Sequence, residues 1–184
     1  MNKCMHIVAA VILLGVATAA SGFMNLNFES YSGSGSDLLP YWERSIGDYM
    51  WPLLDMLPIS TSGLGLVSQD GEHIQALTDY YSAFFSAGTG DSPAIWQTDI
   101  VPVNATHIQI ATTGIDRDNY SFSYTLGGIS LIESTPVAEG GHYVYTTDIS
   151  SLAGQMATIQ LGVSYIGDPF TPGGWHLVDD ISFV

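Results

Sequence analysis

The sequence predicts an all-β protein, an antiparallel jelly-roll β-sandwich of about 8–10 strands. Apolar and polar side chains alternate over several short segments, as they do in half-buried strands whose successive side chains point to opposite faces. Glycine pairs separate these segments, and glycine allows the positive φ of tight turns. No long amphipathic helix competes with this pattern. These features together are typical of sandwiches and jelly rolls.

Residues 1–20 precede the domain and are predicted to be a signal peptide. Lys3 stands before an apolar run, Ile7–Leu14, and residues 17–19 supply the small side chains of a cleavage site. A membrane anchor is the alternative, but the run is shorter than the roughly 20 apolar residues of a span. Because Cys4 would leave with the signal, disulfides and thiol catalysis are excluded. We expect a secreted, extracellular protein with no membrane span after cleavage, and the periplasm is an alternative location.

Residues 23–184 are expected to form one domain, since a chain of this length can bury a sizeable core. The predicted strands are Phe23–Glu29, Gly65–Ser68, His73–Leu77, Ile95–Val101, His107–Thr113, Tyr120–Leu126, Ile129–Glu133, Tyr143–Thr147, Thr158–Tyr165 and Leu177–Phe183. An irregular loop at 32–62 is rich in aromatic residues, with a short helix near Ile46–Met50, and such long loops are often functional. One helical turn is predicted at Asp148–Gly154, capped by its aspartate and ended by its glycine.

The chain is strongly acidic, with 18 Asp and Glu residues against 3 Lys and Arg and a net charge of −15. After removal of Lys3, Arg44 and Arg117 are the remaining basic side chains. This balance excludes nucleic acid and anionic membranes as partners, because both need a basic surface. It favours either the attraction of cations or simple solubility in a salty exterior, where charge is screened.

Signals of enzyme activity are weak. No histidine pair has the spacing of a metal-binding helix, and the nucleophile elbow, phosphate loop and dinucleotide-binding motifs are absent. Glu43, Asp48 and Glu72 could supply the carboxylate pair of a glycosidase. Solvated surface carboxylates are the simpler interpretation of each. We therefore expect a protein that is not an enzyme, with a glycoside hydrolase-like enzyme as the less favoured alternative.

A carboxylate in the last predicted strand indicates a special site. Asp179 falls on the apolar face that Leu177, Ile181 and Phe183 define. Burying a charged group is costly unless it is paired, and the chain has almost no basic partners. A calcium ion held by Asp179, Glu29 and backbone carbonyls would solve this problem. The alternative is that Asp179 accepts backbone N–H groups in a turn or bulge.

Four stretches that span the chain carry a family resemblance by their order and spacing. They are Asn27-Phe28-Glu29 followed by Trp42, Ile100 to Ala105, Asp148 to Gln155, and Val178 to Phe183. In these the chain resembles the jelly-roll domains of secreted bacterial proteins that often carry a PEP-CTERM sorting tail. Those domains are similar to carbohydrate-binding modules of the family 4/9/22 type, within the galactose-binding-like superfamily.

The resemblance implies an antiparallel jelly roll with a structural calcium site where Glu29 approaches Asp179 and Asp180. It also implies binding of glycans, although a fold alone does not establish a function. The sequence departs from the pattern because it reaches Val184 without a sorting motif, apolar helix or basic tail. We therefore expect release rather than sorting to the cell surface.

Glycan binding would need exposed aromatic rings that stack on sugars. Trp42 and Trp51 lie in the irregular loop, and Tyr143 and Tyr145 share one strand face, so these four are the predicted ligand-binding residues, with Trp96 and Trp175 as further candidates. The alternative is that such rings fill the core. We expect a secreted, non-catalytic module that binds a polysaccharide or matrix glycan. A structural or adhesive protein of an extracellular matrix is the alternative.

Overall fold

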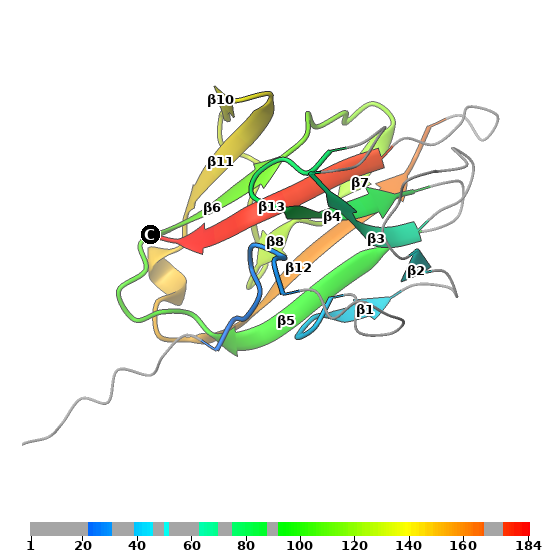
Figure 1. Ribbon diagram of the computed structural model, residues 1–184. Helices are drawn as coiled ribbons and strands as arrows, with labels where there is room; N and C mark the ends of the chain where they lie inside the picture. Colours follow the sequence, from blue (N-terminus) through cyan, green and yellow to red (C-terminus); the bar gives the residue numbers. More distant parts are fainter. Residues whose placement is uncertain are drawn as a thin grey trace, which may run out of the picture.

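The structure, a computed structural model, describes residues 22–30, 39–45, 50–51, 63–69, 75–87, 92–167 and 175–184. These residues form two β-sheets that face each other across a common core (Figure 1). The prediction of an all-β sandwich is therefore confirmed. The described residues contain thirteen strands, more than predicted, because several of them are only two or three residues long.

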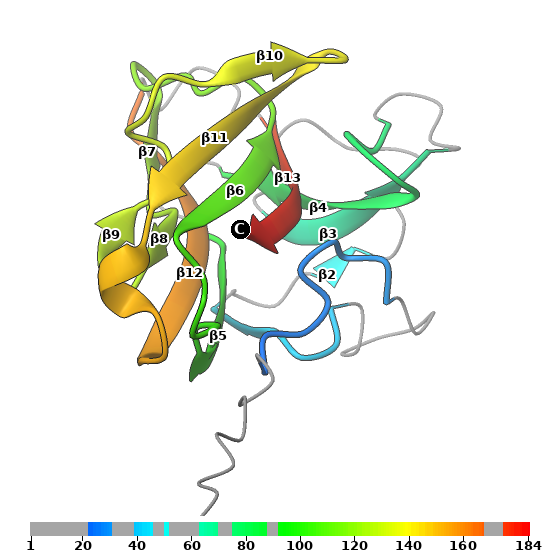
Figure 2. The same ribbon diagram turned by 90° about the vertical axis from the view of Figure 1, so that its left-hand side faces the viewer.

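The strands are arranged in a six-stranded and a seven-stranded sheet. The six-stranded sheet has the order β1 (Glu43–Ser45), β5 (Ala94–Ile100), β12 (Met156–Tyr165), β8 (Thr125–Leu126), β9 (Ile129–Ser130), and β7 (Tyr120–Phe122) also pairs with β12. The seven-stranded sheet has the order β10 (Val137–Glu139), β11 (His142–Asp148), β6 (His107–Thr112), β13 (Trp175–Phe183), β4 (Tyr81–Ser86), β3 (Gly63–Ser68), β2 (Met50–Trp51). Among the described strand pairs, β2 and β3 are parallel and the others are antiparallel. In Figure 2, β10, β11 and β6 lie above β8, β9 and β12.

The core between the sheets is filled by alternate residues of the strands. In β12, Ile159, Leu161 and Val163 point inwards, and in β6 Ile108 and Ile110 do so. Each of these side chains is at most 1% exposed. Burying a side chain of this size contributes about 1.5–3 kcal/mol. The period of two in the sequence therefore determines which face of each strand enters the core.

The central strand β4 was not predicted, and its position explains why. Its residues, Tyr81–Ser86, lie between β13 and β3, and five of the six are buried. A strand that is buried on both faces carries a continuous apolar run instead of an alternating one. Phe84 and Phe85 are adjacent, point to opposite faces and are each at most 1% exposed. The sequence of β4 therefore lacks the alternation of apolar and polar residues by which the other strands were predicted.

The first predicted strand, Phe23–Glu29, is wrong, because the described residues 22–30 contain no strand and turn at residues 26–28. Asn25 and Phe28 have φ angles of +52° and +57°, which interrupt an extended backbone. The Phe28 N–H donates to the Asn25 carbonyl at 3.2 Å, and the Phe28 side chain is fully buried. The segment thus closes one side of the core without joining a sheet.

Strand β13 contains a bulge that corrects the predicted position of Asp179. Asp179 pairs with Ala111 of β6, and Ser182 pairs with Gln109, so one extra residue lies in β13 between these pairs. Asp180 has a φ of +43° at this point. Before the bulge, Asp179 shares its face with Leu177 and points away from the space between the sheets. After it, Ile181 and Phe183 point inwards. The prediction that Asp179 shares a face with Ile181 and Phe183 is therefore wrong.

Two of the predicted glycine turns lie in the described residues and are confirmed. Gly127 and Gly128 connect β8 to β9, and Gly140 and Gly141 connect β10 to β11, all with positive φ. The predicted helical turn is a 3-10 helix, Ser150–Leu152. The carboxylate of the preceding Asp148 accepts the N–H of Ser150 at 2.9 Å, and Gly154 follows with a φ of +71°.

Several predictions fall partly or wholly outside the described residues: the signal peptide at 1–20, most of the loop at 32–62 with its short helix, and the first two residues of the strand His73–Leu77. The described residues 75–77 of that predicted strand are not in a strand, so the prediction is wrong there. The described part of the loop contributes the short strands β1 and β2. Of the described helical residues, none belongs to a helix long and apolar enough to span a membrane.

Candidate functional site

Trp42 is not the exposed ring that was predicted. It is 6% exposed, its ring stacks on Phe28 with 5.5 Å between centroids, and its indole N–H donates to the Asn25 carbonyl at 3.2 Å. Tyr41, with a φ of +74°, turns the chain so that Trp42 enters the core, while Tyr41 itself is 62% exposed. Trp42 therefore holds the N-terminal segment in place. The side chain of Trp51 lies outside the described residues.

Tyr143 and Tyr145 share one face of β11, as the period of two predicts. Tyr145 is buried, at 6% exposure, whereas Tyr143 is 40% exposed. The ring of Tyr143 lies beside Gly114, where an added Cβ would be 3.5 Å from its Cε2 atom. Of the four predicted ligand-binding residues, Tyr143 is the one whose described side chain reaches solvent.

A second exposed aromatic region lies on the outer face of the six-stranded sheet, around Trp96. In β5, Ile95 points into the core, so Trp96 and Thr98 point outwards. In β12, Ile159 points into the core, so Gln160 and its alternate neighbours also point outwards. Trp96 is half-buried and lies near the middle of this face.

Cross-strand pairing places one outward side chain of each of five strands in a continuous row. This Trp96 row consists of Glu43 (β1), Trp96 (β5), Gln160 (β12), Thr125 (β8) and Ser130 (β9), each paired with the next. Paired residues of adjacent strands lie on the same face of a sheet. With about 4.8 Å between strands, the row spans roughly 19 Å. It carries an aromatic ring, an amide, a carboxylate and two hydroxyls.

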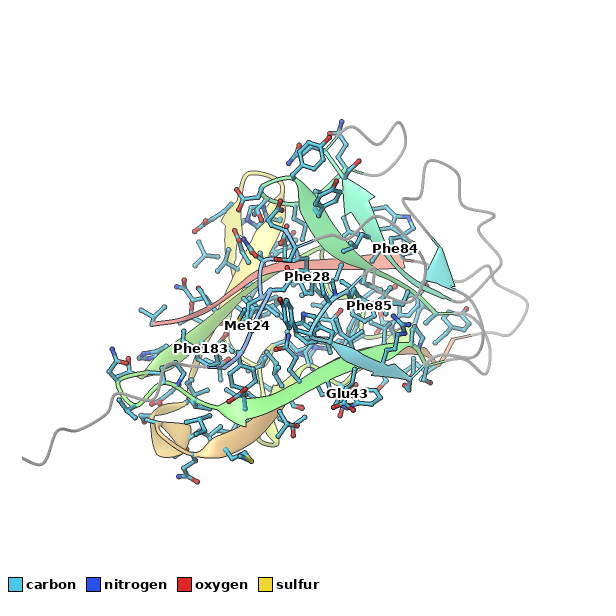
Figure 3. All side chains as sticks on the ribbon, turned by 60° about the horizontal axis from the view of Figure 1, so that its bottom comes forward. Met24, Phe28, Glu43, Phe84, Phe85 and Phe183 are labelled. Atoms are coloured by element: carbon cyan, nitrogen blue, oxygen red, sulfur yellow. The ribbon has the colours of Figure 1, made fainter. Side chains whose placement is uncertain are left out.

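Hydrogen bonds fix several of these side chains. The Trp96 indole N–H donates to the Glu43 carboxylate at 3.1 Å, and the Gln160 amide donates to the Ser123 hydroxyl at 3.3 Å. The hydroxyls of Thr98 and Thr158 are 2.7 Å apart on the same face. Figure 3 shows Glu43 on the opposite side of the β1 and β5 ribbons from Phe85. The face therefore presents ordered polar groups around one ring.

The row could not be deduced from the sequence, although its aromatic member was a candidate. The alternation within residues 95–101 already places Trp96 opposite Ile95. The missing information was the pairing of β5 with the distant β1 and β12, which brings Glu43 and Gln160 to either side of Trp96. Because β1 lies in the segment predicted to be an irregular loop, its contribution had no sequence signal.

Asp179 lies on the outer face of the seven-stranded sheet and is fully buried. Its Oδ2 accepts the Thr78 N–H at 3.3 Å, the Thr78 hydroxyl at 2.8 Å and the Ser82 hydroxyl at 2.7 Å. Its Oδ1 accepts the Asp180 N–H at 2.9 Å. Burial raises the pKa of Asp179 to about 7, although the hydrogen bonds from Ser82 and Thr78 oppose the rise. The alternative to calcium was that Asp179 accepts backbone N–H groups in a turn or bulge, and the N–H groups of Thr78 and Asp180 are such donors.

Glu29 approaches the same segment of the chain as Asp179. Its Oε1 accepts the backbone N–H groups of Tyr80 and Tyr81 at 2.9 and 2.7 Å. The Ile181 N–H donates to the Leu26 carbonyl at 3.1 Å, which ties the N-terminal segment to the bulge. No group of three or more His, Cys, Asp or Glu side chains arranged for a metal ion occurs in the part of the chain that is described. Calcium at Glu29, Asp179 and Asp180 stays a prediction.

His176 is the most unusual of the described histidines. Its ring lies edge-on to Tyr120 and Phe122, each at 4.7 Å between centroids, and neither ring nitrogen has a hydrogen-bond partner. Burial lowers the pKa of His176 to about 4, opposed by the charge of Asp116. The ring is therefore neutral at pH 7 and serves as part of the core.

Of the three carboxylates considered for the less favoured glycosidase alternative, Glu43 is the one within the described residues, and Asp48 and Glu72 lie outside them. Glu43 accepts the Trp96 indole N–H in the Trp96 row. The structure thus assigns Glu43 a position beside an aromatic ring.

No family model matches the sequence, and no curated protein matches it. The fold is similar to a solved structure described as TmCBM61 in complex with β-1,4-galactotriose, with 14% identity and a TM-score of 0.48 over 90% of this chain and 99% of the other. It is also similar to the enzymatically active domain of tailspike protein 4 of bacteriophage CBA120, with 14% identity and a TM-score of 0.45 over 89% of this chain and 21% of the other. At these values the likenesses assign neither a family nor a function to the chain.

Proposed function

We propose that this protein is a secreted, non-catalytic module that binds an uncharged polysaccharide on the outer face of its six-stranded sheet. The observation that carries the proposal is the Trp96 row. An aromatic ring provides an apolar surface for stacking, and polar side chains placed around it provide orientation and specificity. A row across five strands suits an elongated ligand, because its groups are spaced along a line.

The charge of the face supports an uncharged ligand. In the described Trp96 row, Glu43 is the one charged residue, and the chain as a whole has a net charge of −15. An acidic polysaccharide would be repelled by this field. The same row supports binding over hydrolysis, because glycosidases use two carboxyl groups on either side of the scissile bond, and the row contains one.

Binding can be tested with the mature protein and a panel of β-1,4-galactan, xylan, mannan and mixed-linkage β-glucan, with alginate as the acidic polymer. We expect retention on at least one uncharged polymer and none on alginate. Loss of a stacking ring worth about 1.4 kcal/mol corresponds to about tenfold weaker affinity. Trp96→Ala is therefore expected to weaken binding about tenfold or more.

The matched control is Trp175→Ala, which removes a 43% exposed tryptophan from the seven-stranded sheet. It should leave the affinity unchanged. Equal weakening by both variants, or the absence of retention on every uncharged polymer, would contradict the proposal.

We further propose that the fold contains a structural calcium site at Glu29, Asp179 and Asp180. Glu29 and Asp179 both accept hydrogen bonds from residues of the segment 78–82, and Asp180 follows Asp179 in the bulge. Calcium prefers carboxylate and carbonyl oxygens, and its charge would offset the burial of Asp179. An ion that binds the folded state alone raises its stability. The melting temperature should therefore rise by several degrees with calcium after EDTA treatment, and equal melts in EDTA and calcium would reject the site.

A further inference from the structure

The Trp96 row does not end at the edge strand β9 but continues through hydrogen bonds to a second group of side chains. Ser130, the last residue of the row, donates from its hydroxyl to Oε1 of Glu133 at 3.4 Å. The same oxygen accepts a hydrogen bond from the Arg117 guanidinium at 3.2 Å. Arg117 also donates to the Ile132 carbonyl at 2.7 Å. Polar groups thus lead from the outer face of the six-stranded sheet around its edge.

This edge lies next to β11 of the other sheet. The Thr147 hydroxyl donates to the Leu131 carbonyl at 3.2 Å, which joins β11 to the residues that follow β9. Tyr145 and Tyr143 occupy the same face of β11 as Thr147. The pKa of Tyr145 is raised mainly by burial. The charge of Arg117 lowers this pKa and Tyr143 raises it, so the Arg117 and Tyr143 side chains both lie close enough to act on the Tyr145 phenol. Figure 2 shows β9 and β11 on the same side of the molecule.

We infer that Tyr143, Arg117 and Glu133, which we call the Tyr143 corner, form a second subsite for the same polysaccharide chain. The inference rests on the proposed function and extends it, because it makes the ligand a chain long enough to pass from the Trp96 row around β9. Tyr143 supplies an exposed ring, Arg117 supplies donors, and Glu133 supplies an acceptor. Their opposite charges compensate each other, so the corner suits an uncharged sugar.

The local backbone keeps the corner open. Gly114 lies beside the Tyr143 ring, and its missing side chain leaves that side of the ring uncovered. The backbone of Gly114 is not in the left-handed region, so a larger residue can be accepted there without backbone strain. The Arg117 side chain is 54% exposed, yet two hydrogen bonds define its direction. Such a group loses little freedom when a ligand binds.

Two linked subsites predict that affinity depends on chain length. A ligand that occupies one subsite reaches the second at a high effective concentration, provided that it is long enough to span both. A short fragment can occupy the Trp96 row alone. The tightest-binding polysaccharide of the panel above and its trisaccharide therefore serve as the two probes, measured by calorimetry on the mature protein.

We expect Tyr143→Ala and Gly114→Leu to weaken binding of the polysaccharide about tenfold and to leave the affinity for the trisaccharide unchanged. Gly114→Leu covers the ring without removing it, so it separates access to the ring from its contribution to folding. Tyr80→Ala, which removes a 45% exposed tyrosine elsewhere, is the matched control and should change neither affinity. Trp96→Ala should weaken binding of both probes.

The outcomes separate the two claims. If Tyr143→Ala and Gly114→Leu leave the affinity for the polysaccharide unchanged while Trp96→Ala lowers it, the Tyr143 corner is rejected and the proposed function stands. Equal affinity of the wild-type protein for polysaccharide and trisaccharide also rejects the corner. If Trp96→Ala has no effect on either probe, the proposed function fails first and the corner fails with it as an extension of the row.

Discussion

The outer faces of the two sheets differ in what they expose. On the six-stranded sheet, the Trp96 row presents polar side chains and a half-buried ring to solvent. On the seven-stranded sheet, the corresponding face is closed around Phe84, Leu177 and Asp179, which are at most 1% exposed. The seven-stranded sheet is therefore buried on both faces over part of its area, whereas the six-stranded sheet is buried on its inner face.

The difference shows how the two faces divide binding from stability. The closed face contains a buried carboxylate whose partners come from the turn before β4 and from β4 itself, so its side chains are committed to contacts within the protein. The open face bonds its side chains mainly to neighbours on the same surface. Substitutions on the closed face should therefore change stability, and substitutions on the open face should change binding.

The largest expected effect comes from removing a large buried ring on the closed face. Phe84→Ala should lower the free energy of unfolding by about 3–5 kcal/mol, because it leaves a cavity as well as losing buried apolar surface. Trp96→Ala on the open face should lower it by about 1 kcal/mol. Urea unfolding monitored by circular dichroism measures the free energy of unfolding of both variants. Tryptophan fluorescence gives a second measurement for Phe84→Ala. Similar losses in the two variants would end the distinction between the faces.

The next largest effect is the pH dependence that Asp179 imposes on the stability of the calcium-free protein. Its pKa is about 7 in the folded protein, against an ordinary value of 3.8 for an aspartate in water, so the folded state binds more protons between these values. The resulting contribution is fully present below pH 3.8 and is lost as the pH rises through 7. At about 1.4 kcal/mol for each pH unit between the two pKa values, the loss is at most about 4 kcal/mol.

His176 in the core contributes the opposite slope. Its pKa is lowered to about 4 from 6.5, so its contribution is present above pH 6.5 and is lost as the pH falls through 4. The two groups therefore offset each other between about pH 4 and 6.5 in the wild-type protein. Chemical unfolding of Asp179→Asn should show stability rising with pH in this window, and that of His176→Phe should show it falling. Identical profiles for the two variants would contradict both assignments.

A smaller effect is expected from one hydroxyl of the closed face. Thr78→Val keeps the side-chain shape and removes the 2.8 Å hydrogen bond to Asp179. It should cost about 1–3 kcal/mol, because a buried acceptor loses a donor. The midpoint of urea unfolding at pH 7 measures this cost. A midpoint equal to that of the wild-type protein would mean that the hydroxyl does not support the buried carboxylate.

The smallest effect is expected from the same substitution on the open face. Thr98→Val removes a hydroxyl that contacts Thr158 at 2.7 Å, but water can replace this exposed contact. The free energy of unfolding should change by no more than about 0.5 kcal/mol. Because the chemistry of the substitution is identical, the ratio of the Thr78 and Thr98 losses compares the faces directly. A larger loss at Thr98 would reverse the comparison.

The sequence was informative wherever one side of a strand is buried and the other is not. The alternation in β12 and β6 predicted both strands, and the glycine pairs predicted two hairpins. It was uninformative for β4, whose two buried faces remove the alternation, and for β1, which lies in an aromatic-rich segment without periodicity. In β13 the alternation was misleading, because the bulge changes which face a residue occupies.

The candidate site was less predictable than the fold, because it depends on pairing between distant strands. Tyr143 was identified from its strand alone, but the other members of the Tyr143 corner, Arg117 and Glu133, come from outside β11. Trp42 was expected at the surface because its segment looked irregular. The positive φ of Tyr41 turned it inwards, and residue type does not reveal such an angle.

The bulge in β13 also determines what kind of sequence change this strand can accept. Before the bulge the even-numbered residues of β13, such as Val178, point to the core, and after it the odd-numbered residues Ile181 and Phe183 do so. The change occurs at Asp180. Deleting Asp180 would remove the bulge and keep Ile181 and Phe183 directed to the core, because Ser182 would then follow Asp179 at the same two-residue spacing that separates Gln109 from Ala111. The strand can therefore lose one residue at position 180 without changing which of its side chains enter the core.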